Sequence, residues 1–125
     1  MKARFSLFMS FGIAALLLCA LTTPAHHGWA GNSDKEFELT GIVTTGVSLS
    51  GPHATMKIRA EGQIWDLTLA PPAATERAGL KEGIIPVGAM VSIHGHRNLD
   101  PNKFEVKTER ITWNGREFNV YPGRT

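Results

Sequence analysis

Beyond residue 35, apolar and polar residues alternate along several short segments of the chain. In residues 36–43, EFELTGIV, the apolar Phe37, Leu39 and Val43 share one parity, and the polar Glu38 and Thr40 take the other. Successive side chains of a strand point to opposite faces, so this period of two predicts a strand with one buried and one solvated face. Residues 55–60, 64–69 and 90–95 alternate in the same way. The alternation therefore restricts the chain to a mainly β fold.

Turn signals separate the predicted strands. A Gly-Pro pair at residues 51–52 lies between the first two, and a Glu-Gly pair at residues 61–62 predicts a tight hairpin between the second and third. Residues 72–79 then break the alternation. They begin with a proline that can open a helix, continue through alanines and end with a glycine that can close it. We expect one short helix there.

The last long strand is predicted at residues 104–113. Its apolar parity changes between Val106 and Ile111, which indicates a β-bulge. The Asn-Gly pair at residues 114–115 is a strong hairpin signal and returns the chain through Phe118. The strand therefore carries an irregularity before it turns back.

The order of three strands, a short helix and two strands predicts a five-stranded OB-like β-barrel, with a small open sandwich as the competing architecture. Gly41, inside the first strand, suits the sharp bend that such a barrel needs. The apolar face of each strand supplies the expected core: Phe37, Leu39, Val43, Met56, Ile58, Trp65, Leu67, Leu69, Val91, Ile93, Ile111 and Trp113.

The first 25 residues have the layout of a secretory signal peptide. Lys2 and Arg4 precede an apolar run from about residue 5 to residue 21, and small residues follow at 23–25. A retained membrane anchor is the alternative, since the run is close to the shortest that spans a bilayer. We therefore expect a signal peptide at 1–25, an N-terminal arm at 26–36, a barrel domain at 37–125, and a periplasmic or secreted location.

Cleavage after Ala25 also changes the composition of the mature chain. It removes Cys19, so no disulfide is expected. It removes Lys2 and Arg4, so the 13 basic residues fall to 11 and balance the 11 acidic ones. No basic surface for nucleic acid is left, and no membrane contact is expected after cleavage. A protein partner is not indicated.

All five histidines lie beyond the predicted cleavage site. Cleavage after Ala25 would give His26 a free amine beside its imidazole, a pair that can chelate one ion and that favours Cu(II). His27 follows directly, and His53 stands in the loop after the first strand. The alternatives are a disordered leader, a histidine bonded to a loop carbonyl, or cleavage after Ala30, which would remove the first two.

His94 and His96 are two residues apart on a predicted strand, so both are expected on the same outward face. In an OB-type barrel the loop holding His53 and the loop after the fourth strand flank one face, so the three can converge there. The alternative is two solvated edge residues. Neither a cysteine nor an HExxH-type spacing is present in residues 26–125, which disfavours a closed structural zinc site.

An enzyme is not predicted. Ser48 and Ser50 precede His53, but no nucleophile elbow surrounds them, and no glycine-rich loop opens a helix. A metal-free binding module for a small ligand or a protein is the alternative to metal binding. Its surface would be the outer face of the second and third strands, where the sequence places Lys57, Arg59, Asp66 and Thr68.

Several landmarks in this order resemble a family of small exported bacterial proteins of unknown function. They are a leader ending in Ala-His-His, an LTG-V strand, a Pro-His turn, a Trp-containing strand, a Gly-Leu after the helix, and a G-x-V-x-I-x-G strand. Here these are Ala25-His26-His27, Leu39-Thr40-Gly41 with Val43, Pro52-His53, Trp65, Gly79-Leu80, and Gly88 through Val91 and Ile93 to Gly95.

The resemblance implies a periplasmic OB-like barrel and carries no established activity or cofactor. The family's turn is usually Asn-Pro-His, and this chain has Gly51 in place of the asparagine. His26, His27 and His53 match the family pattern, whereas His94 and His96 do not. We therefore predict an exported protein that binds copper or a similar ion through His26, His27 and His53.

Overall fold

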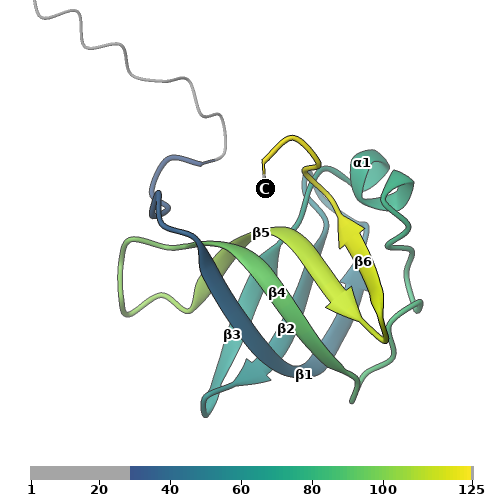
Figure 1. Cartoon of the computed structure of the whole chain (residues 1–125), viewed down its shortest axis with the longest axis horizontal. Coiled ribbons are helices and arrows are strands. Elements are labelled where there is room, and N and C mark those ends of the chain that lie inside the picture. The colour runs from purple at the N-terminus through teal and green to yellow at the C-terminus, as the bar shows by residue number, and fades with distance from the viewer. Residues whose placement is uncertain (1–28, 125) are drawn as a thin grey trace, which may run out of the picture.

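The computed structural model of the protein describes residues 29–124, so the predicted signal peptide, His26 and His27 lie outside the described residues. Figure 1 shows a rolled sheet with one short helix at its edge. The elements are β1 (Phe37–Ser48), β2 (Thr55–Ala60), β3 (Gln63–Thr68), α1 (Pro72–Arg77), β4 (Met90–Arg97), β5 (Glu105–Trp113) and β6 (Arg116–Asn119).

The sheet closes on itself as a five-stranded barrel. Its strand order is β3-β2-β1-β4-β5-β6, and a parallel pairing between β3 and β5 joins the two sides. Every other neighbouring pair is antiparallel, and β6 extends the sheet beyond β5. The predicted OB-like barrel is therefore confirmed, and the open sandwich is excluded.

The predicted hairpin turns and the predicted short helix are confirmed as well. The Glu-Gly and Asn-Gly pairs at residues 61–62 and 114–115 form the β2–β3 and β5–β6 turns, and all four residues have positive φ. Two such residues in succession match the twist of a hairpin. The helix α1 starts at Pro72, and Gly79 follows it with φ at 98°.

Ten of the twelve predicted core residues are buried inside the barrel; Phe37 and Trp113 are only partly buried. Phe37 is the first residue of β1 and Trp113 is the last residue of β5, so both lie at strand ends, where the barrel covers a side chain less completely. The core also takes in Leu80 and Ile85 from the segment between α1 and β4, and Phe118 from β6.

A β-bulge interrupts the pairing of β4 with β5. His94 pairs with Arg110, but the next residue, Gly95, pairs with Thr108, which leaves Glu109 as an extra residue. This is the bulge that the parity change predicts between Val106 and Ile111. A Cβ on Gly95 would lie 2.1 Å from the Lys107 carbonyl oxygen, so the bulged strand passes directly over this glycine.

The described part of the N-terminal arm, residues 29–36, is tied to the end of β4. Ser33 N donates to the Arg97 carbonyl over 2.7 Å, and Asn32 forms a β-bridge with Asn98. The arm therefore crosses one end of the barrel before β1 begins, close to the C-terminal segment (Figure 1). Within residues 29–124, no helix has the length and apolarity needed to cross a membrane.

Candidate metal centre

Three side chains from three separate segments converge where the arm meets the barrel. Glu36 ends the arm, His96 lies near the end of β4, and Glu109 is the bulged residue of β5. Each offers one ligand atom, and these atoms all lie within 4.8 Å of one another. An imidazole and two carboxylates at this spacing form a donor set suited to a divalent first-row metal ion.

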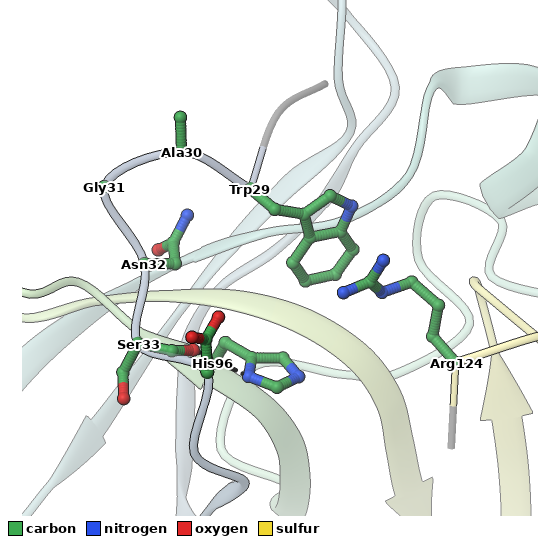
Figure 2. Close-up of a pocket in the computed structure, with 8 residues that line it drawn as sticks. Trp29, Ala30, Gly31, Asn32, Ser33, His96 and Arg124 are labelled. Carbon is green, nitrogen blue, oxygen red and sulfur yellow. Dashed lines mark hydrogen bonds between the residues drawn. The ribbon is translucent and has the colours of Figure 1, made fainter. Parts of the chain in front are cut away.

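The imidazole of His96 is held in one orientation by the arm. Its Nδ1 lies 2.8 Å from the Ser33 carbonyl oxygen, a contact drawn as a dashed line in Figure 2. A carbonyl oxygen can only accept, so Nδ1 donates, and Nε2 is the ring nitrogen left to face the two carboxylates. That nitrogen lies 2.7 Å from Glu109 Oε1 and 3.9 Å from Glu36 Oε1. Histidine ligands of metals are commonly fixed in this way, through the other ring nitrogen.

Glu109 is an acidic side chain placed in the protein interior. It is 1% exposed, and neither carboxylate oxygen accepts a hydrogen bond of regular geometry from the residues that the structure describes. Arg124 Nε is 3.7 Å from its Oε1, too far for a hydrogen bond. A buried charge without hydrogen bonds is costly, because it has lost its hydration without replacement. A cation between Glu109 and His96 would remove that cost.

Glu36 links His96 to a second histidine. One carboxylate oxygen faces His96, and the other contacts His94 Nε2. His94 Nδ1 in turn lies 3.1 Å from Glu38 Oε1. His94 therefore stands beside the centre as a further nitrogen donor on the same side of β4.

Two cavities open onto this centre and share His96 and Arg124. One, of about 300 Å³, is lined by Glu36, His96, Glu109, Gly123 and Arg124. The other, of about 250 Å³, lies under the arm and is shown in Figure 2; its lining is Trp29, Ala30, Gly31, Asn32, Ser33, Asp34, His96 and Arg124. A bound ion would thus be accessible from outside.

Trp29 covers the same region from the arm. Its ring meets His96 and Tyr121 edge to face, with centroids 5.5 Å and 5.2 Å away. The Arg124 guanidinium lies 4.0 Å from its ring centre, and Lys107 Nζ lies 5.5 Å from it. Both cations are thus held against an aromatic face.

Two groups around Trp29 have altered acidity because they are poorly solvated. Burial lowers the pKa of Lys107, which is 6% exposed and pairs with His96 across the β4–β5 ladder. Burial raises the pKa of Tyr121, and the charge of Arg124 partly offsets this. Burial thus disfavours the charged form of both groups.

The structure places one of the three predicted metal ligands, His53, which lies in the loop between β1 and β2. Burial, and secondly the charge of Lys107, lower the pKa of His53. The group formed by Glu36, His96 and Glu109 does not include it. His26 and His27 lie outside the described residues, so their predicted role remains a prediction.

The prediction for the other two histidines is half right. His94 and His96 do share one face of β4, since both contact Glu36. The expectation that both point outward into solvent is wrong for His96, which is buried at 7% exposure. The arm lies over this face and shields it, a tertiary contact that strand periodicity does not encode.

Sequence reasoning missed the two carboxylates of the centre. Glu36 precedes the first strand and reads as an ordinary surface residue. Glu109 sits within the predicted bulge, next to the change of parity between Val106 and Ile111. A bulge re-aims the side chain that it displaces, so an acidic residue at that point was a usable signal.

Comparisons with known proteins support the fold alone. No family model matches the sequence, and no curated protein is significantly similar to it. A solved structure of TiaS, the ZRD-deleted mutant in complex with agmatine, matches 69% of this chain with a TM-score of 0.51 and 15% identity. The match covers 26% of the TiaS chain, so this chain spans about a quarter of it.

Proposed function

We propose that this protein is an exported, periplasmic or secreted, binding protein that holds copper or a similar divalent ion, and that it is not an enzyme. The signal-peptide layout and the resemblance to small exported bacterial proteins support export. Support for metal binding comes from the described residues Glu36, His96 and Glu109. The ion would sit between them, with His94 close by as a further donor.

One observation carries the proposal: His96 Nε2 lies 2.7 Å from a carboxylate oxygen of buried Glu109. With Nδ1 committed to the Ser33 carbonyl, a neutral imidazole and an ionised carboxylate would meet acceptor to acceptor. A divalent cation satisfies both groups at once. A protonated His96 would also do so, and in that case the pair is structural and no ion binds.

The ligand types narrow the class of ion. Imidazole suits copper, zinc, nickel and iron, whereas carboxylates alone would suit magnesium or calcium. Copper binds most tightly of the divalent first-row ions to a given mixed nitrogen and oxygen site. The histidines His26, His27 and His53 remain a second ligand set in this proposal, and they would bind the same class of ion.

Metal titration of the exported protein tests the proposal. The full chain is expressed with its own leader, the exported form is purified and its amino terminus sequenced, and binding of Cu(II) and Zn(II) is followed by calorimetry. We expect one ion per chain and a loss of affinity of at least about 100-fold in Glu109→Gln, which keeps the shape and removes the ligand charge. Glu117→Gln, on β6 and paired with Arg110, is the matched control.

Two further variants separate the ligand sets. His96→Ala removes the described centre, and His53→Ala removes the predicted alternative. Loss of binding in His53→Ala with full binding in His96→Ala would move the site to His53 and the amino-terminal histidines. A wild-type protein that takes up neither ion contradicts metal binding altogether and leaves the metal-free binding module.

A further inference from the structure

Arg124 is a cation placed beside the metal centre with hydrogen-bonding capacity to spare. It lines both cavities that open onto His96. Its guanidinium lies 4.0 Å from the Trp29 ring centre, and Figure 2 shows the two side chains next to each other. Its Nε is buried and makes no hydrogen bond to any of residues 29–124. The Glu109 carboxylate is its nearest acidic group, and that contact, 3.7 Å, is longer than a hydrogen bond.

The charge around the centre is left positive once an ion is bound. A divalent ion is neutralised by Glu36 and Glu109, so the charges of Arg124 and Lys107 are no longer balanced by these acids. Asp34 also lines the cavity under the arm and offsets one of the two. One positive charge therefore remains beside the bound ion.

Three protein ligands also leave coordination positions of the ion open. A site with three protein donors characteristically takes water or an exogenous molecule at the next position. The open side of this centre faces the cavity lined by Arg124. A ligand entering from there meets the ion and the guanidinium together.

We propose that the metal-loaded protein binds a small carboxylate, with one oxygen on the ion and the carboxylate fork on Arg124; this inference rests on the proposed metal binding. Guanidinium matches the planar carboxylate in geometry as well as in charge. The cavity that opens on Glu36, His96, Glu109 and Arg124, about 300 Å³, has room for a ligand of about the size of a dicarboxylic acid. Asn32 lines the adjoining cavity under the arm, which shares His96 and Arg124, and can hydrogen-bond the other end of the ligand.

Succinate binding to the copper-loaded protein tests the assignment. Calorimetry is expected to show one succinate per chain, and the Cu(II) electron paramagnetic resonance spectrum is expected to change as the oxygen enters the coordination sphere. Succinamide, the neutral analogue of similar shape, should not bind. Arg124→Gln should weaken succinate binding at least tenfold while leaving copper affinity within about twofold, and Arg116→Gln, at the opposite end of β6, should behave as wild type.

The remaining outcomes are each decisive. Equal succinate affinity in Arg124→Gln, or equal binding of succinamide, would overturn the role of Arg124. Binding of inorganic phosphate in preference to succinate would overturn the carboxylate assignment. Copper uptake without any anion binding would overturn this inference alone, whereas a protein that takes up no metal would overturn both it and the proposed function.

Discussion

The barrel interior is apolar, whereas the candidate metal centre combines the exposed Glu36 with two buried polar side chains. The interior holds nineteen buried apolar residues that need only contact one another. Within the centre, Glu109 and His96 are buried polar groups whose desolvation needs specific partners. The first region explains why the chain folds. The second is hard to explain by folding alone, because an apolar residue at position 109 would avoid the cost of burying a carboxylate.

The largest expected effect lies in the barrel interior. Trp65 is 1% exposed, and its Nε1 donates to the Ala60 carbonyl over 3.2 Å. Trp65→Ala should lower the free energy of unfolding by about 3–5 kcal/mol, measured by urea denaturation, because it leaves a large cavity. Its neighbour Ile64 is 42% exposed, and Ile64→Ala should cost far less. Equal losses would contradict the assignment of Trp65 to the core.

Added metal should stabilise the centre and leave the interior's contribution unchanged. At a free ion concentration of 100 times the dissociation constant, wild type should gain about 2.7 kcal/mol of unfolding free energy. Glu109→Gln should lose most of this gain, whereas Trp65→Ala, measured where it is still folded, should keep it. The comparison is read from denaturation curves with and without the ion. A gain retained in Glu109→Gln would show that the ion binds elsewhere.

Gly95 stands where the two regions meet, so a change there should affect both. The added Cβ of Gly95→Ala would lie 2.1 Å from the Lys107 carbonyl, and the bulged strand must move to admit it. We expect a loss of about 1–3 kcal/mol in unfolding free energy, together with weaker metal binding. Gly46→Ala is the matched control, because its Cβ would meet nothing closer than the Ile85 carbonyl at 3.9 Å. A Gly95→Ala protein with wild-type stability would contradict the tight crossing.

The smallest expected effect is on the pKa of His53, which the charge of Lys107 helps to lower. Burial is the larger cause of the lowered pKa of His53, and Lys107 is the second. Lys107→Met should therefore raise this pKa only part of the way to its ordinary value, as read from the histidine ring resonances in an NMR titration. Lys57→Met, whose lysine pairs with Asp66 on the surface, is the control. An unchanged His53 pKa in Lys107→Met would contradict the contribution of the Lys107 charge.

The lowered pKa of His53 also makes the stability of the fold depend on pH. His53 has a lower pKa in the folded protein than in the unfolded chain, so the unfolded chain takes up the proton first as pH falls. The contribution of His53 to the free energy of unfolding is therefore complete above about pH 6.5. It is lost as the pH falls towards the lowered pKa that His53 has in the folded protein. Lys107→Met should make that acid-side loss smaller.

The barrel could be predicted from the sequence because its determinants are local. Strand parity placed ten core residues correctly, paired turn residues located both hairpins, and a change of parity located the bulge. Phe37 and Trp113 are partly exposed because they cap strand ends, where parity no longer reports burial. These errors are small and do not alter the topology.

The metal centre could not be predicted because it is assembled by a contact between distant segments. His96 is buried only because the arm lies across β4, with Ser33 more than sixty positions earlier in the chain supplying the carbonyl that orients it. Glu36 and Glu109 are likewise brought together only because β1 and β5 pair with opposite edges of β4. Histidine spacing pointed to the correct strand, and the predicted bulge pointed to Glu109, but no sequence pattern singles out Glu36.

The position of a bound metal tests the central claim most directly. Crystals of the copper- or zinc-loaded exported protein would give an anomalous scattering peak at the ion. The account predicts this peak at about 2.0–2.2 Å from both His96 Nε2 and a Glu109 carboxylate oxygen, with Glu36 within reach. A peak beside His53, or metal-treated crystals with no peak between His96 and Glu109, would contradict it.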